Sequence, residues 1–516
     1  MAMVTILRYR RTRCVGKEEK SFMNEPLKFK WHSLYGQMLR DRKLREAWKQ
    51  VKTNKGSGGI DGETIAEFDK KSEERILEIL EKLKTKTYTP APVRRVYIPK
   101  KSGGKRPLGI PVIEDRIIQQ TLVNILSPKF ENGIFHKCSC GYRPNYGMEK
   151  VMQLILWNIE KGRNYIYDCD IKGFFDNIPH KQLMRVLNKY IADGTVLNLI
   201  WKWLKAGYME EGKYLETNSG TPQGGVISPL LANIYLNELD WELAKAGIYF
   251  VRYADDFLLF AESEEKIIEA GELAQKVIQE LGLEIAMNKT KIVDFHDDDF
   301  TFVGFDFQHW RNRKKDGKPY FLVTPTEKSL KDFKMKIKEK TKKTLTLSKE
   351  EWVKRVNYVI VGKVNYYKTV QKAIKLNEQA GQESHCYVKG CIGNLHKLDA
   401  YIRQRLRVCM IHKHPNIRKG FAKIGVWNIE FFCKIGLIPA AWHYYKDMYP
   451  SYTIDVYVNK QQEKNKVRKE KYINKLKEQG IKYYTQERIK KIVNSGVNLR
   501  YSGCLLYTSD AADEGL

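Results

Sequence analysis

The chain has 516 residues, more than one ordinary domain holds, so two to four domains are expected. With 42% apolar residues it can bury sizeable cores, and no apolar run or lipidation signature points to a membrane. The formal net charge of +30 instead predicts a polyanionic partner. Nine cysteines without a C-x-x-C pair are typical of free thiols in a reducing compartment.

The first 23 residues are basic and contain no acidic residue before Gly16. Two interpretations stay open: an organellar presequence, or translation that begins at Met23. We expect a cytoplasmic bacterial protein, with an organellar location as the alternative.

Two segments upstream of residue 120 are rich in glycine or in cations. Residues 56–62 read GSGGIDG, and residues 96–111 carry Lys100 and Arg106 among apolar residues and prolines. Five cations lie between Lys100 and Arg116, so a solvated basic turn is one interpretation of any one of them.

A first candidate catalytic acid ends a predicted strand. Residues 164–170 alternate apolar and polar side chains, which predicts a β-strand with Asp170 at its end. Two aromatic residues, Phe174 and Phe175, come next, and residues 181–190 read as a helix.

A polar elbow follows at residues 219–233, SGTPQGGVISPLLAN. Its glycines and prolines predict a tight turn that opens into an apolar helix. Gln223 in this elbow offers both a hydrogen-bond donor and an acceptor where the backbone can approach a ligand.

A pair of adjacent acids, Asp255 and Asp256, lies between two apolar, aromatic-rich runs in residues 250–260. This pattern predicts a buried hairpin with carboxylates at its turn. Three carboxylates from two separate strands, these two and Asp170, suit a site for two cations. The alternative is a set of solvated acids at strand ends.

The chain becomes basic and helical after residue 308. Residues 325–347 read as a basic helix, and Arg403 and Arg407 lie at i and i+4 on one helix face. Residues 460–500 are a cationic run, which is either a solvated face or a nucleic-acid contact. Residues 504–516 turn acidic and resemble the translation of a sequencing adapter, so we expect them to be an artefact.

Taken in order, these segments resemble reverse transcriptases encoded by group II introns. The segments that carry the resemblance are residues 56–62, 96–111, 139–144, 170–180, 219–233, 253–256, 283–291 and 302–305, with a weaker likeness at 352–367 and 398–407. The resemblance implies an α+β multidomain fold: a right-hand polymerase with fingers, a palm built on an antiparallel sheet and a helical thumb, followed by a mainly helical maturase domain and a basic segment.

The resemblance also implies roles for individual residues. Asp170, Asp255 and Asp256 would hold two Mg²⁺ ions. Phe175 would be the steric gate against a ribose 2′-hydroxyl, with a core phenylalanine as the alternative. The remaining implied contacts are Lys100, Arg106, Gln223 and Lys289 for the nucleotide, and Arg403 and Arg407 for RNA.

The domains expected on this basis are 24–308 for fingers and palm, 309–450 for thumb and maturase, and 451–503 for a DNA-binding-like region. The expected partners are group II intron RNA, a DNA target or primer and deoxynucleoside triphosphates, with a homodimer left open. Two rival functions are a splicing-only maturase and a retron-like or diversity-generating reverse transcriptase. The chain has no pattern like the His, Asn and paired-cysteine endonuclease domain of many relatives, and a sequence that continues past residue 503 could still contain one.

Overall fold

The computed structural model describes residues 30–99, 104–310, 320–386, 390–413 and 426–479. These residues form two compact units. Unit 1 runs to Asp298 and includes Ala373–Ser384, and unit 2 comprises Asp299–Lys372 and the chain from His385 onward. The division falls before the expected boundary at residue 308 because strands on both sides of that position pair with one another in unit 2.

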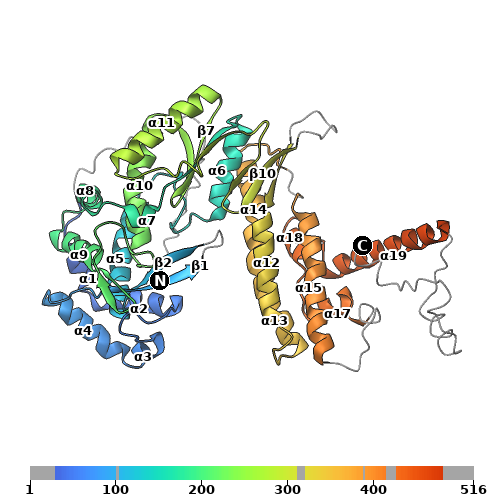
Figure 1. Cartoon of the computed structure of the whole chain (residues 1–516), viewed down its shortest axis with the longest axis horizontal. Helices are drawn as coiled ribbons and strands as arrows, with labels where there is room; N and C mark the ends of the chain where they lie inside the picture. The colour runs from blue at the N-terminus through green and yellow to red at the C-terminus, as the bar shows by residue number, and fades with distance from the viewer. Residues whose placement is uncertain (1–29, 100–103, 311–319, 387–389, 414–425, 480–516) are drawn as a thin grey trace, which may run out of the picture. The chain divides into compact units, whose positions relative to one another are not determined.

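Unit 1 combines helices with two four-stranded sheets, in which neighbouring strands are not always consecutive in the sequence (Figure 1). Its helices are α1 (Leu34–Met38), α2 (Asp41–Asn54), α3 (Ile65–Lys70), α4 (Ser72–Lys84), α5 (Ile113–Glu131), α6 (Met148–Glu160), α7 (Phe174–Asn177), α8 (His180–Tyr190), α9 (Gly194–Lys205), α10 (Ser228–Lys245) and α11 (Glu264–Glu280). Its strands are β1 (Val93–Pro99), β2 (Lys105–Ile110), β3 (Tyr165–Asp170), β4 (Tyr208–Glu210), β5 (Lys213–Leu215), β6 (Tyr249–Tyr253), β7 (Asp256–Ala261) and β8 (Lys291–Asp294).

The predicted antiparallel sheet is present, with strand order β6-β7-β3-β8. Alternate residues of β3 and β7, such as Cys169 and Leu259, are buried in the main core, where α11 packs on both strands. Because side chains alternate across a strand, Asp170 and Asp256 lie on the opposite face. The predicted hairpin is confirmed, since β6 pairs with β7 and Tyr253 is opposite Asp256.

Helix α10 begins at Ser228, within the segment predicted as the elbow, and most of its residues are buried. Its buried side chains, which include Leu231, Ile234 and Leu236 and the polar Asn233, are spread around the helix rather than along one stripe. It packs on α5, α8, α11 and β6. The elbow is therefore anchored to the centre of the core.

The second sheet of unit 1 has the order β2-β1-β4-β5. Strands β1 and β2 form an antiparallel hairpin in which Ile98 is opposite Arg106. Strand β1 also pairs in parallel with β4, and the Arg95 guanidinium lies 3.4 Å from the centre of the Tyr208 ring. This cation–π contact helps to hold the hairpin to the rest of the sheet.

Unit 2 begins with a three-stranded sheet and continues as helices. Its elements are β9 (Phe300–Phe302), β10 (Phe305–Trp310), β11 (Tyr320–Pro325), α12 (Glu327–Lys340), α13 (Lys349–Tyr367), α15 (Ile392–Lys413), α17 (Ile429–Lys434), α18 (Ala440–Tyr445) and α19 (Ile454–Glu478), while α14 (Thr369–Gln379) runs from unit 2 into the Ala373–Ser384 segment of unit 1. The basic helix expected over 325–347 is shorter: α12 starts after its N-cap Thr326 and ends at Lys340, where the C-cap Thr341 leaves the helical conformation, and a capping box of Ser348 and Glu351 then starts α13.

A buried carboxylate organises the second half of unit 2. Asp399 on α15 accepts hydrogen bonds from the backbone N–H of Ala440 at 2.6 Å and of Ala441 at 3.1 Å, at the start of α18. It also accepts one from the Tyr457 hydroxyl on α19, at 2.8 Å. One side chain thus ties together three helices, and charge-assisted bonds of this kind are stronger than neutral ones.

None of the helices that the structure describes is long and apolar enough to span a membrane. Helix α19 lies in the basic segment expected from residue 451, whereas the rest of that segment and residues 504–516 lie outside the described residues, as does the N-terminal extension 1–23.

Candidate active site

The turn between β6 and β7 carries Asp255 in a strained hairpin. The turn consists of Ala254 and Asp255, because Tyr253 and Asp256 already pair across the strands. Ala254 has a positive φ of 62°. This conformation is rare for a residue with a Cβ, and it persists only where surrounding contacts impose it.

Asp170 and Asp256 are directly opposite each other on neighbouring strands. Like charges in such a cross-strand pair destabilise a sheet. Loss of hydration, and then the charges of Asp255 and Asp170, raise the pKa of Asp256 to about 7. Loss of hydration also raises the pKa of Asp255, and Asp170 adds to the effect. The fold therefore concentrates negative charge at the ends of these two strands.

A lysine forms an ion pair with one of these acids. Lys289 Nζ donates to Asp170 Oδ2, and this hydrogen bond is the main reason that the pKa of Lys289 is raised. The backbone brings the two together, since Ala286 N donates to Asp170 O at 2.8 Å and Lys289 N donates to Ala286 O at 2.8 Å. The predicted lysine thus lies in contact with the predicted acid.

Strand β3 carries one more acid that the sequence motifs did not single out. Asp168 lies two residues before Asp170, so both project from the same face of the strand. Burial raises the pKa of Asp168 to about 6, while the charge of Lys291 on β8 lowers it. The signal in the sequence was the D-x-D spacing at the end of an alternating strand.

The elbow contacts the β1–β2 hairpin through its backbone. Gly109 N donates to Gln223 O at 2.6 Å. Gly224 has a φ of 107°, and a Cβ there would lie 2.5 Å from Gly109 O, so glycine is required at this close approach. The Gln223 side chain is partly exposed beside this contact.

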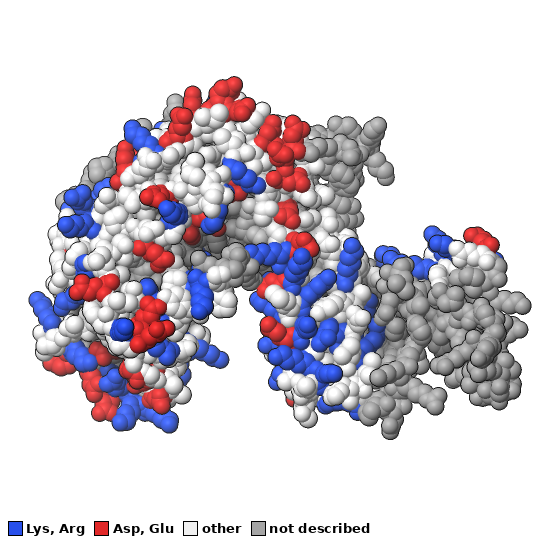
Figure 2. Space-filling view, in the orientation of Figure 1, with Lys and Arg blue, Asp and Glu red and all other residues white. Residues whose placement is uncertain are grey.

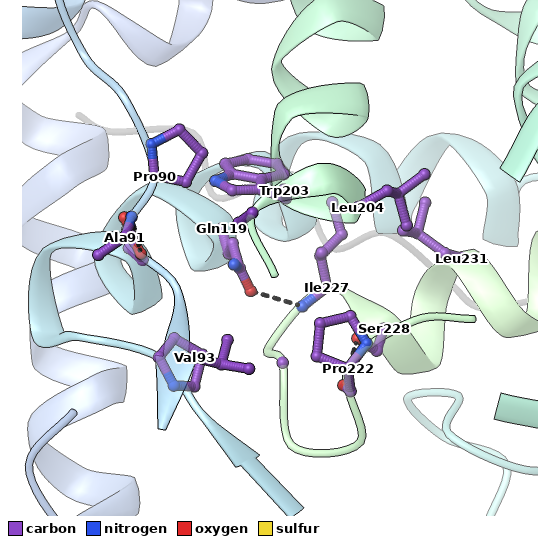
Figure 3. Close-up of a pocket in the computed structure, with 14 residues that line it drawn as sticks. Pro90, Ala91, Val93, Gln119, Trp203, Leu204, Pro222, Ile227, Ser228 and Leu231 are labelled. Atoms are coloured by element: carbon purple, nitrogen blue, oxygen red, sulfur yellow. Dashed lines mark hydrogen bonds between the residues drawn. The ribbon is translucent and has the colours of Figure 1, made fainter. Parts of the chain in front are cut away.

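A cavity of about 20 Å³ lies behind the elbow, room for roughly one water molecule. Figure 3 shows Gln119 reaching the backbone of Ile227 from the opposite wall, where its Oε1 accepts from the N–H at 3.4 Å. Ser228 Oγ donates to Pro222 O at 2.9 Å. These hydrogen bonds hold the elbow in place, and none of the three carboxylates lines the cavity.

The predicted gate, Phe175, lies beside two other rings. It contacts Phe174 with ring centres 5.4 Å apart and Tyr142 with centres 6.2 Å apart, both edge-on. Arg106 is exposed on β2, and its charge acts on Asp255 and on Tyr142. The structure therefore brings Arg106, Phe175 and the acids to one site, whereas Lys100 lies outside the described residues.

A buried arginine that the motif analysis missed supports the turn. Arg252 Nη1 donates to Ala254 O at 2.8 Å and to Asn233 Oδ1 at 3.2 Å. Its Nε and Nη2 donate to the two carboxylate oxygens of Asp240 at 2.7 and 2.6 Å, and Nη2 also donates to Ser139 Oγ at 2.6 Å. All five N–H donors are therefore used, and the turn is fixed to α10.

In this structure the three carboxylates are not arranged around a common metal position. Among the described residues, no group of three His, Cys, Asp or Glu side chains is arranged to hold a metal ion. The donor chemistry nevertheless fits a hard divalent cation, because carboxylate oxygens are the ligands that Mg²⁺ prefers and their charges repel one another. Lys289 occupies one Asp170 oxygen in this arrangement.

In unit 2 the two arginines predicted to bind RNA are partly buried on α15. Arg407 Nε donates to Trp427 O at 3.1 Å, and the Arg403 charge lowers the pKa of buried Asp399, which burial raises. Arg405, between them, lines an open groove of about 680 Å³. The other residues lining this groove are Met335, Lys338, Glu339, Lys342, Lys343, Thr344 and Val408.

Basic side chains dominate this part of unit 2. On the face shown in Figure 2, blue Lys and Arg side chains outnumber red acidic ones over the region of α12 and α13. Such a surface attracts phosphate groups through sequence-independent electrostatics. The density of lysines in residues 325–347 predicts this basic surface, but the sequence did not predict the groove.

The antiparallel sheet, its acidic turn and the elbow together have the design of the palm of a reverse transcriptase. Residues 98–307 match the family model described as reverse transcriptase (RNA-dependent DNA polymerase). This match covers the Arg106 strand, the three acids and Lys289.

Sequence comparison with known proteins narrows the family. The group II intron-encoded protein LtrA of Lactococcus lactis subsp. cremoris is 44% identical over 210 residues, 40% of this chain and 34% of that protein. Protein YkfC of Escherichia coli K12 is 31% identical over 312 residues, 52% of this chain and 81% of that protein. An uncharacterized 91 kDa protein in the cob intron of Schizosaccharomyces pombe is 29% identical over 362 residues, 58% of this chain and 44% of that protein. The chain belongs to the family of group II intron-encoded reverse transcriptases and maturases, and its match spans about a third of the length of LtrA.

Proposed function

We propose that this protein is an RNA-directed DNA polymerase whose reaction centre is formed by Asp170, Asp255 and Asp256. The observation that carries the proposal is the cross-strand pair Asp170 and Asp256 beside Asp255 in a strained turn. Two adjacent strands thus concentrate acids, and burial raises the pKa values of Asp255 and Asp256, an arrangement that costs stability and is typical of functional sites. Asp170, Asp255 and Asp256 would hold two Mg²⁺ ions.

Bound Mg²⁺ would supply Lewis-acid activation of a primer 3′-hydroxyl and charge stabilisation for the departing pyrophosphate. The protein's own residues orient the reactants. Arg106, exposed on β2, would bind the triphosphate, and its planar guanidinium suits phosphate oxygens. Phe175 would crowd a 2′-hydroxyl, and Lys289 would balance charge at Asp170. Lys100 and Gln223 complete the proposed nucleotide contacts.

The polymerase proposal is tested by Asp255→Asn in primer extension on an RNA template. We expect the rate to fall by roughly 10²–10³-fold, because a group that stabilises transition-state charge is lost. Thermal unfolding should be unchanged or shifted upward, since a repelling carboxylate is removed. An Asp255→Asn protein that extends primers at the wild-type rate would overturn the assignment.

The gate proposal is tested by Phe175→Ala. Removing the ring opens space where a 2′-hydroxyl would collide, so incorporation of ribonucleotides should rise relative to deoxynucleotides. Single-nucleotide extension with each nucleotide type measures this ratio. A ratio equal to that of the wild type would count against a gate at Phe175.

A second function, assistance of intron splicing, is favoured by the basic groove of unit 2. Lys338, Lys342 and Lys343 line this groove and are exposed. Because lysine side chains are flexible, they can reach phosphate groups at irregular positions. We propose that group II intron RNA is the partner and that Arg403 and Arg407 support this surface. Copying of the intron into a DNA target would then combine both activities in one chain, acting in the cytoplasm.

Splicing and extension should separate by mutation. The Asp255→Asn/Asp256→Asn variant should still promote splicing, because RNA binding depends on basic surface rather than on the acids. Replacing Arg403 and Arg407 with Ala should impair splicing, more so at higher salt, while extension of a generic primer persists. If the double-acid variant loses splicing, or the arginine variant loses only extension, this division is wrong.

A further inference from the structure

Tyr142 combines a strained backbone with an exposed ring. Its φ is 57°, in the left-handed region, and its side chain is 54% exposed. A bulky residue is a clear outlier in that region, where the strain is of order 1–3 kcal/mol. About half of the residue stays exposed, so packing in the core does not explain why the fold keeps it there.

The backbone on both sides of Tyr142 is tightly fixed. Asn233 Nδ2 donates to Gly141 O at 2.7 Å, on the N-terminal side. On the C-terminal side, Arg143 donates to the carboxylate of Glu131 at 2.8 Å and to Ser139 O at 2.7 Å. These bonds are buried or partly buried, and they hold the backbone on both sides of Tyr142.

The Tyr142 ring faces the proposed nucleotide site. It meets Phe175 with an interplanar angle of 77°, and Phe174 packs on Phe175 at 64°. Burial raises the pKa of the Tyr142 hydroxyl, and the nearby charge of Asp255 raises it further while Arg106 lowers it. Tyr142 therefore stands among the gate, the turn acid and the cation of β2.

We propose that Tyr142 is a positioning residue that braces Phe175, so that the ring of Phe175 cannot turn aside when a nucleotide carries a 2′-hydroxyl. The inference rests on the proposed polymerase function and deepens it. Without Tyr142, Phe175 would keep Phe174 as a ring neighbour and have open space where Tyr142 stood. An edge-on aromatic pair shifts an equilibrium by roughly two- to tenfold, and this is the contribution to selectivity that we assign to Tyr142.

The test compares incorporation of a deoxynucleotide and the matching ribonucleotide by the full chain. Tyr142→Asn removes the ring but tolerates the left-handed backbone, so the loop is retained. We expect its ratio of kcat/KM values, deoxy over ribo, to fall roughly two- to tenfold, through a lower KM for the ribonucleotide and with kcat for the deoxynucleotide kept. Tyr142→Phe keeps the ring and should keep the wild-type ratio.

Two controls separate bracing from a general effect. Tyr249→Ala removes another exposed tyrosine, 42% exposed on β6 with the Arg163 guanidinium 3.3 Å from its ring centre, and should leave the ratio unchanged. Adding Tyr142→Asn to Phe175→Ala should change nothing further, because Tyr142 acts through Phe175.

An unchanged ratio in Tyr142→Asn overturns the inference while the polymerase proposal stands. A lowered ratio in Tyr142→Phe, or an additive effect in the double variant, also overturns it. A wild-type protein that extends no primer refutes the polymerase proposal itself, and the inference falls with it.

Discussion

Replacing Arg252 with methionine should strongly destabilise unit 1. The guanidinium is buried against Asp240, which is itself buried, and the substitution leaves that carboxylate without its charged partner. Breaking a buried ion pair in this way costs about 3–5 kcal/mol. In a domain of this size that corresponds to a fall in the midpoint of thermal unfolding of roughly 6–20 °C.

The Arg252→Met/Asp240→Leu variant should recover much of that loss, because no uncompensated charge remains in the core. Primer extension should stay impaired in both variants, since Ala254 O has lost its donor and the turn before Asp255 is no longer fixed. The matched control is Arg163→Met, which removes a half-buried arginine that donates to Asn158 Oδ1 at 3.0 Å and not to a buried acid.

The assay is thermal unfolding of each variant by circular dichroism at pH 7 in 0.15 M salt, with extension measured well below the midpoint. A loss below about 1 kcal/mol in Arg252→Met, or a double variant as unstable as the single one, would refute the reasoning. Normal extension by the double variant would show that the turn does not need this anchor.

Three further predictions concern single side chains. A Cβ at Gly141 would lie 2.3 Å from Ala254 N, so Gly141→Ala should displace the acidic turn and lower primer extension more than it lowers the unfolding midpoint. Burial raises the pKa of Asp115 from 3.8 to about 7 against the opposing hydrogen bonds of Tyr88 and Ala91. Ionisation of Asp115 therefore costs stability as pH rises from about 4 to about 7, and Asp115→Asn should flatten that decline in a series of unfolding curves. Asp399→Ala should cost unit 2 several kcal/mol, roughly 2–4, because the start of α18 and the Tyr457 hydroxyl lose their acceptor, and urea unfolding would measure it.

Local patterns were sufficient to predict the elements that carry the acids. Alternation ending at Asp170 predicted β3, and two apolar runs around Asp255 and Asp256 predicted the hairpin, because a strand's side-chain period is visible in the sequence. The basic helix predicted over 325–347 is longer than α12, because the pattern of lysines continues through the residues between α12 and α13. In the structure Thr341 ends α12 and Ser348 caps the start of α13.

The sequence by itself determined which residue types meet at the site and their order along the chain. Only the tertiary structure decided that Asp170 lies opposite Asp256, that Arg252 links the acidic turn to Asp240 and Ser139, and that the ring of Tyr142 packs edge-on against Phe175. The contacts of Asp170 with Asp256, of Arg252 with Ser139 and of Tyr142 with Phe175 join segments that are far apart in the chain, and no local periodicity encodes which distant side chain fills a given space. Register between strands and the packing of one central helix, α10, supply that information instead.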